Sequence, residues 1–190
     1  MAIQAHWAKN VIKVLVFVCL ANNSITGQNL RENRLTDIQQ EVLNQVFAPQ
    51  HNKVFIYNTT DFDKGWSIYF EKDDLSLITQ KVGFPTKITD GELLEILKPN
   101  VIKQIWHEIL HLKPYSLEKN RFNPKIILTK SYDKPVDLKR GVIKISAPII
   151  IGDIAVYREI GAQKSPIFIL QKAKQQWEVI YTFYHWNIIE

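Results

Sequence analysis

The chain has 190 residues, with 24 Lys and Arg against 19 Asp and Glu, so its formal net charge at pH 7 is +5. Apolar residues make up 46% of the sequence and charged residues 23%, which excludes an intrinsically disordered chain. A single cysteine excludes a disulfide framework. No apolar run reaches the roughly 18 residues of a membrane-spanning helix. The length therefore indicates one globular domain with a sizeable core.

The N-terminal segment 1–27 has the pattern of a secretory signal peptide. Lys9 and Lys13 precede the apolar run 14–21, and small residues suited to a cleavage site follow. We therefore expect export, with residues 28–190 forming one domain that is secreted, periplasmic or held in the cell envelope. Two alternatives stay open, because the apolar run is also compatible with a buried strand or with a retained membrane anchor.

Three helices are predicted by their start signals. The capping box Thr-Asp-Ile-Gln at 36–39 opens an amphipathic helix, and a second box, Thr-Asp-Gly-Glu at 89–92, opens a helix that Pro99 ends. Asn100 is a candidate cap for the third helix, 101–112.

Alternating or β-rich residues predict the strands of one sheet. In the first half these are 54–57, 66–70 and a short strand at 75–79, with the segment 61–65 as a hairpin turn between the first two. The remaining strands are 126–132, 142–151, 154–160, 167–172 and 177–187. Gly152 and Asp153 supply a two-residue hairpin turn, and the short connections imply an antiparallel meander.

The third predicted helix carries the segment His107-Glu108-Ile109-Leu110-His111, which matches H-E-x-x-H. Histidines four residues apart lie on one helical face, so both imidazoles can bind one zinc ion, and the glutamate can act as general base toward metal-bound water. On a helical wheel of about 100° per residue, the histidines point away from the apolar face. That orientation suits a metal site in a cleft and equally suits a solvated helix face. No familiar pattern after His111 identifies the third ligand.

The last predicted strand is unusually aromatic. One face would hold every second residue from Trp177 to His185, and the other would include Tyr184 and Trp186. These two side chains are candidate ligand-binding residues in an open concavity of the sheet. The alternative is that loops or a partner chain cover this face.

The segment 145–149 reads Ile-Ser-Ala-Pro-Ile, and an aromatic hairpin strand at 167–172 precedes the Trp-Glu-Val of 177–179. In this I-S-x-P and W-x-V/I pattern, residues 140–190 resemble a group of uncharacterised secreted bacterial proteins. The resemblance implies a small exported α+β domain and no particular activity.

Together these features predict an α+β domain in which a curved antiparallel sheet of five or more strands, with a C-terminal meander, packs against about three helices. We expect a non-enzymatic binding or interaction domain that needs no cofactor. The alternative is a zinc-dependent metallopeptidase that uses the segment 107–111. The chain has neither a basic cluster nor a phosphate-binding loop, so we expect no nucleic-acid partner, and we expect no transmembrane helix in the mature chain.

Overall fold

The computed structural model describes residues 33–50, 52–71, 75–79, 86–130, 142–160 and 165–185. Most of these residues belong to one compact unit, Leu35–Glu190. The predicted signal peptide, 1–27, lies outside the described residues, as does Trp186. Within the described ranges, no helix is long and apolar enough to cross a membrane.

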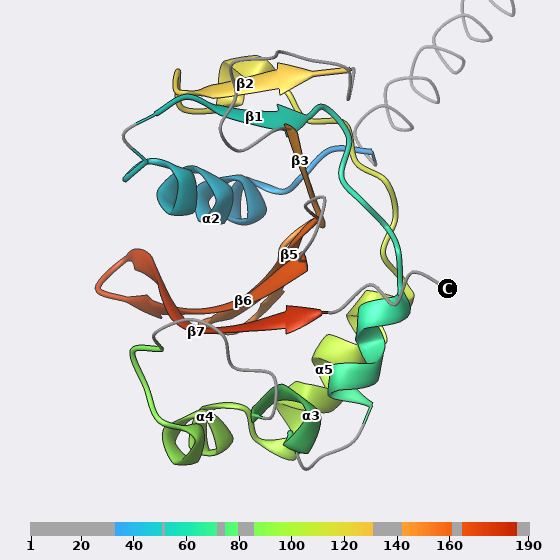
Figure 1. Ribbon diagram of the computed structural model, residues 1–190, viewed down its shortest axis with the longest axis vertical. Helices are drawn as coiled ribbons and strands as arrows, with labels where there is room; N and C mark the ends of the chain where they lie inside the picture. The colour runs from blue at the N-terminus through green and yellow to red at the C-terminus, as the bar shows by residue number, and fades with distance from the viewer. Residues whose placement is uncertain are drawn as a thin grey trace, which may run out of the picture. The chain divides into compact units, whose positions relative to one another are not determined.

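The described residues form an α+β fold around an open curved sheet (Figure 1). The α-helices are α2 (Asp37–Phe47), α3 (Ser76–Thr79), α4 (Asp90–Ile96) and α5 (Pro99–Leu110), and the 3₁₀-helices are η1 (Gly65–Phe70) and η2 (Lys119–Arg121). The strands are β1 (Val54–Tyr57), β2 (Ile126–Thr129), β3 (Val142–Ile145), β4 (Ile149–Ile151), β5 (Ile154–Ile160), β6 (Ser165–Ala173) and β7 (Gln176–His185).

The strand order is β2-β1-β3-β5-β6-β7, and β4 pairs with β5 outside this path. The antiparallel C-terminal meander is confirmed by the pairing of β5 with β6 and of β6 with β7. However, β1 runs parallel to both β2 and β3, so the sheet is mixed rather than wholly antiparallel. The described residues also hold more helices than the predicted three.

Both predicted capping boxes are confirmed. The Oγ1 atom of Thr36 accepts the backbone N–H of Gln39 at 3.3 Å, and the side chain of Gln39 accepts the N–H of Thr36 at 2.9 Å. The box at 89–92 has the same reciprocal bonds at the start of α4. The predicted cap of α5 is wrong. The helix begins at Pro99, so Asn100 is already its second residue, and the N-cap is Lys98. A proline at the first helical position has the right φ and lacks an N–H that would otherwise be unpaired.

The strands predicted at 66–70 and 75–79 are wrong, because these segments form the 3₁₀-helix η1 and a stretch that includes α3. In η1, Trp66 and Tyr69 are three residues apart and both are buried, whereas Ile68 is half exposed. That spacing is typical of a 3₁₀-helix, in which residues i and i+3 lie above one another. An alternation of apolar residues over five positions therefore did not distinguish a strand from a tight helix.

The predicted strand 142–151 is divided in two. It is interrupted at Ala147 and Pro148, and the two parts, β3 and β4, pair with different stretches of β5. The side-chain amide of Gln39 donates to the carbonyl oxygen of Pro148 at 2.7 Å, which ties the interruption to the start of α2. The hairpin turn after β4 is confirmed, and Gly152 has the positive φ of 58° that such a turn requires.

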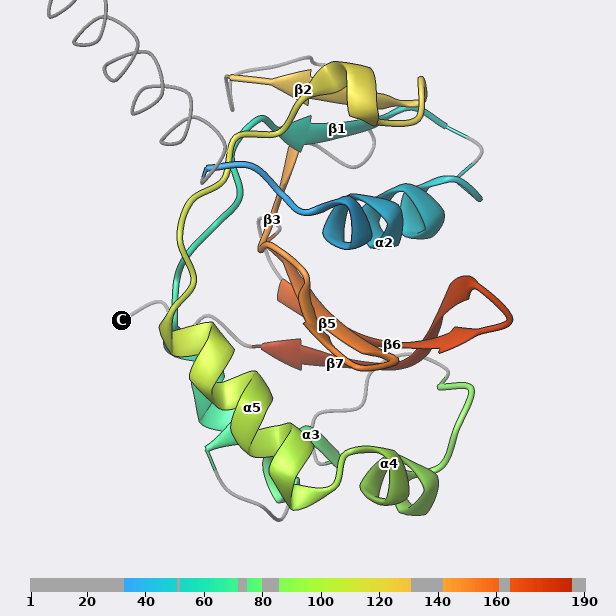
Figure 2. The same cartoon turned by 180° about the vertical axis from the view of Figure 1, so that it is seen from behind.

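Helices cover both faces of the meander, which gives two hydrophobic cores. Helix α2 lies between β1 and the strands β5 to β7, whereas α3, α4 and α5 lie on the opposite face of these strands (Figures 1 and 2). We call the two sides the α2 core and the α5 core. The α2 core contains Val42, Leu43 and Phe47, and the α5 core contains Ile102, Ile105 and Ile109.

A β-bulge reverses the faces of β7. Val179 and Tyr181 pair with consecutive residues of β6, so Ile180 between them has no partner. Trp177 and Val179 therefore pack in the α2 core, whereas Tyr181 and Phe183 pack in the α5 core. The prediction that every second residue from Trp177 onward shares one face is wrong, because one inserted residue inverts the alternation of all later side chains.

Candidate functional site

Helix α5 presents the H-E-x-x-H segment on its outer side. Its inner side is formed by Ile102, Ile105 and Ile109, which are fully buried. The side chains of His107 and Glu108 are 62% and 54% exposed. The orientation predicted from the helical wheel is therefore confirmed: the candidate catalytic and metal-binding residues point away from the core.

The structure brings the two imidazoles together. The rings of His107 and His111 are stacked, with centroids 4.2 Å apart and planes inclined by 28°. Because α5 ends at Leu110, His111 is its C-cap, and its Nδ1 donates to the carbonyl oxygen of His107 at 2.7 Å. The Nδ1 atom of His107 lies 3.7 Å from Oε1 of Glu108.

Among the described residues, no third His, Cys, Asp or Glu joins the two histidines to form a group of three metal-ligating side chains. A catalytic zinc site uses three protein ligands and keeps one position open for water. The pair alone would therefore leave at least two coordination positions open. The assignment of Glu108 as a general base stays a prediction.

Two hollows follow each other along the outer side of α5. The larger, of about 580 Å³, is lined by Asn100, Lys103, Gln104, Trp106, His107, Glu108 and Ile151. The smaller, of about 220 Å³, is lined by Thr36, Gln39, Glu108, His111, Leu112, Tyr115, Ala147, Pro148, Ile149 and Ile150.

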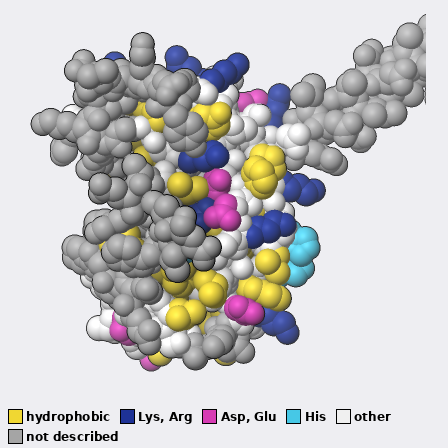
Figure 3. Space-filling view, turned by 45° about the vertical axis from the view of Figure 1, so that its right-hand side comes forward, with side chains coloured by type: hydrophobic (Ala, Val, Ile, Leu, Met, Phe, Trp, Pro, Cys, Tyr) yellow, Lys and Arg dark blue, Asp and Glu magenta, His cyan; other side chains and the backbone are white. Residues whose placement is uncertain are grey.

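The two hollows are neighbours along α5. Glu108 borders both of them. The larger hollow is lined by earlier residues of α5 together with Ile151, and the smaller by Glu108, the residues after it and the segment 147–150. We call this feature the α5–β4 groove. Its middle holds the H-E-x-x-H segment, and histidine side chains stand at the outer surface of this side of the molecule (Figure 3).

The wall opposite α5 is the edge of a strand. Ile151 pairs with Ile154 across the two-residue turn, a position at which both backbone hydrogen bonds are exchanged. Since hydrogen-bonded pairs alternate in an antiparallel ladder, the next pair, Ile150 with Ala155, exchanges none. The N–H and C=O groups of Ile150 therefore point away from β5, and among the described strands none pairs with this edge of β4.

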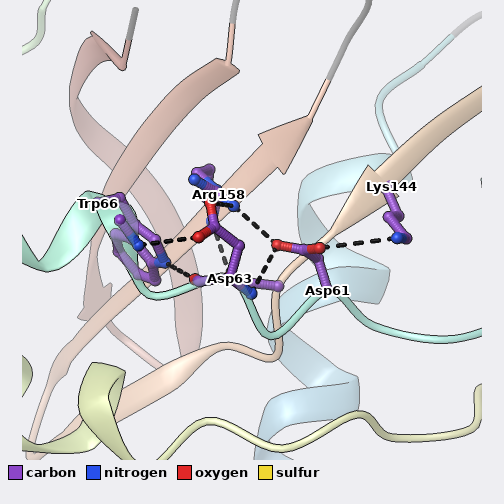
Figure 4. A network of polar contacts seen from close by, with 7 residues as sticks. Asp61, Asp63, Trp66, Lys144 and Arg158 are labelled. Atoms are coloured by element: carbon purple, nitrogen blue, oxygen red, sulfur yellow. Dashed lines mark hydrogen bonds and ion pairs between the residues drawn. The ribbon is translucent and has the colours of Figure 1, made fainter. Parts of the chain in front are cut away.

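A buried ion-pair network lies in the segment that leads to η1, the 3₁₀-helix that packs against α5 (Figure 4). Arg158 of β5 is 1% exposed, and its Nη2 donates to Asp61 at 2.7 Å and to Asp63 at 2.8 Å. Lys144 approaches Asp61 at 3.7 Å. The indole N–H of Trp66 donates to the backbone oxygen of Asp63 at 2.9 Å.

This network corrects the interpretation of 61–65 as a hairpin turn. The backbone N–H of Asp61 donates to the oxygen of Ile145, so the segment first extends alongside β3. It then turns at Asp63, which contacts Arg158. Trp66, the next buried residue, packs in the α5 core together with Ile105. The two aspartates thus hold the segment that leads to η1, and η1 packs against the buried side of α5.

The aromatic end of β7 is adjacent to this network. Tyr184 is partly buried, and its backbone oxygen accepts the Tyr69 hydroxyl at 3.5 Å. The proposed ligand-binding role of Tyr184 is not tested by this contact. His185 packs edge-on against Tyr69 with ring centroids 5.6 Å apart, and its buried Nδ1 has no hydrogen-bond partner in the described structure.

Arg158 and Ile150 were not identified from the sequence. Arg158 directly follows four apolar residues of β5. A charged residue at the end of such a run is the signal that could have found it, since charged residues are almost never buried unpaired. Ile150 has no side-chain signal, because its candidate role belongs to its backbone.

No family model, curated protein or solved structure matches this chain. The resemblance of residues 140–190 to uncharacterised secreted bacterial proteins therefore stays a prediction.

We expect Arg158→Met to destabilise the protein by about 3–5 kcal/mol, because it removes the cation that is hydrogen-bonded to the buried carboxylate of Asp61. Urea unfolding of the full chain, followed by circular dichroism, measures this loss. The matched control is Lys144→Met, which removes a longer and more exposed contact to the same carboxylate and should cost less than about 1 kcal/mol. Equal losses in the two variants would contradict the assigned role of Arg158.

Burial lowers the pKa of His185, and repulsion by Arg158 lowers it further, while Asp63 opposes the shift. A lowered pKa means that this residue contributes stability above its unfolded pKa of about 6.5, and that the contribution is lost as the pH falls toward its folded pKa. Between about pH 7 and pH 5, the wild type should therefore lose unfolding free energy more steeply than His185→Phe, which keeps the ring against Tyr69. Urea midpoints measured across this range test it, and parallel curves would refute it.

Proposed function

We propose that the protein is a non-enzymatic binding domain whose α5–β4 groove takes an extended segment of a partner polypeptide. The observation that carries this proposal is the outward direction of the Ile150 N–H and C=O groups, which lie in a groove walled by a helix. A peptide strand that pairs with a free sheet edge gains its affinity from such main-chain hydrogen bonds, and pockets for alternate side chains add specificity.

The dimensions of the groove suit a short strand. Helix α5 has 12 residues, which at 1.5 Å per residue correspond to a wall of about 18 Å. An extended peptide rises by about 3.3 Å per residue, so about five residues would lie along the wall. Binding would extend the sheet by one strand at β4.

The chemistry of the walls favours a segment without strong net charge. The lining holds one lysine, Lys103, and one glutamate, Glu108, beside several uncharged polar side chains. Apolar contact surface comes from Trp106, Leu112 and Tyr115, which could receive alternate side chains of a strand. The groove therefore lacks the cationic character that a nucleic-acid backbone requires.

We further propose that the domain acts outside the cytoplasmic membrane. The support is the sequence pattern of 1–27, in which lysines precede a short apolar run. Together with the single cysteine at position 19, this pattern implies a mature domain that works without thiol chemistry.

The zinc-dependent metallopeptidase remains the alternative function. It is supported by the convergence of His107 and His111 and by the position of Glu108 between them. It would require a third ligand, for which the described residues offer no group of three.

The groove is tested by Ile150→Pro in the full chain. Proline removes the N–H that points into the groove and leaves the β4–β5 hydrogen bonds in place, since proline is tolerated on an edge strand where the N–H faces outward. Peptides of nine residues selected from a randomised displayed library on the wild type provide the probe. We expect their affinity, measured by fluorescence anisotropy, to fall by about tenfold, the loss for one or more hydrogen bonds.

Ile150→Ala is the matched control, because it removes the same side chain and keeps the N–H. Its peptide affinity should stay within about threefold of the wild type, a difference below 1 kcal/mol. Thermal melting of both variants verifies that each is folded. The proposal fails if no peptide is selected or if the selected peptides bind Ile150→Pro as well as they bind Ile150→Ala.

Export is tested by expressing the full chain in a bacterial host and sequencing the N-terminus of the protein recovered outside the cytoplasm. We expect mature protein that begins near Gln28. Lys9→Glu combined with Lys13→Glu should retain the precursor inside, because the basic residues orient the apolar run. An intact N-terminus in a cytoplasmic protein would contradict the proposal.

A further inference from the structure

The His107–His111 pair brings the two imidazole donors of a metal chelate close together. Four residues separate the histidines, both side chains are exposed, and their ring centroids are 4.2 Å apart. Two nitrogens that share one tetrahedral zinc ion at about 2.0–2.1 Å lie about 3.3 Å from each other. The rings are stacked in the structure, so binding would turn these exposed side chains about their torsions until one nitrogen of each points at the same ion.

One imidazole is already oriented by a backbone contact. Nδ1 of His111 donates to the carbonyl oxygen of His107, so Nδ1 carries the proton and Nε2 keeps its lone pair. Metal-binding histidines commonly donate their second ring nitrogen to a carbonyl or carboxylate in this way, which fixes both tautomer and orientation. The carboxylate of Glu108, 3.7 Å from Nδ1 of His107, is placed to favour the same tautomer in the other ring.

The local electrostatic field also favours a cation. His111 caps the C-terminus of α5, where the carbonyl groups of the last turn carry partial negative charge. Glu108 adds a full negative charge beside the pair. Lys103 lies one helical turn before His107 on the exposed face. Its positive charge opposes the attraction of a cation to the pair.

We propose that His107 and His111 bind one late first-row divalent cation, Cu²⁺, Ni²⁺ or Zn²⁺, through one nitrogen each. Water, or donor groups of a molecule in the α5–β4 groove, would fill the other coordination positions. Imidazole ligands select these ions over Mg²⁺ and Ca²⁺, which prefer oxygen donors. This site requires neither peptidase activity nor peptide binding in the groove, so it stands or falls separately from the function proposed above.

Isothermal titration of the untagged full chain with each metal chloride alone tests the site. We expect one high-affinity cation per chain, with Cu²⁺ bound more tightly than Ni²⁺ or Zn²⁺ and no heat from Mg²⁺. His107→Ala and His111→Ala should each weaken Cu²⁺ binding by about 100-fold, because the second donor of a chelate binds at high effective concentration. The matched control, His51→Ala, removes a histidine elsewhere in the chain and should leave the affinity unchanged.

Electron paramagnetic resonance of the Cu²⁺ complex gives an independent readout. The wild type should display hyperfine structure from two imidazole nitrogens, and each single variant should display one. Both variants change exposed side chains, and melting curves in the absence of metal verify that they fold. Unchanged affinity in His107→Ala or His111→Ala, or equal loss in His51→Ala, would overturn the proposal.

Discussion

The interaction on which the architecture depends is the contact of one buried guanidinium with two carboxylates. Arg158 projects from β5 into the α5 core, where a charge without partners would be strongly unfavourable. Asp61 and Asp63 come from a segment that is itself neither a strand nor a helix, and that bonds to β3 through the Asp61 N–H. Their attraction to Arg158 fixes the path by which the chain leaves β1 and enters η1. Because the buried arginine needs both carboxylates as partners, the ion-pair network constrains the path of the chain.

That constraint extends to the candidate site. Because η1 enters the core at a fixed point, Trp66 lies 5.9 Å from Arg158 and in the same core as the inner side of α5. Helix α5 is therefore supported by η1 on one side and by the strands on the other. On the opposite wall, Pro148 interrupts the strand that would otherwise be continuous, and Gln39 holds its carbonyl oxygen. The groove lies between two walls that are each fixed by a long-range polar contact.

The parts of this structure that could be predicted are those determined by neighbours in sequence. The capping boxes at 36–39 and 89–92 close on themselves within four residues, and the buried and exposed sides of α5 follow from helical spacing alone. The bulge at Ile180 and the conversion of 66–70 into a 3₁₀-helix depend on packing against distant segments. Asp61 and Arg158 are 97 positions apart in the sequence, so no local sequence pattern could predict their ion pair.

Both candidate binding features arise where regular structure stops. No described strand pairs with the edge at Ile150, because the interruption at Pro148 separates β4 from β3, which pairs with β1. The imidazole of His111 can turn back on the carbonyl of His107 because α5 ends one residue earlier. An uninterrupted strand and a longer helix would have bonded these groups internally. Glu108 borders both hollows, His107 lines one and His111 the other, so the two features share one surface while they use different atoms.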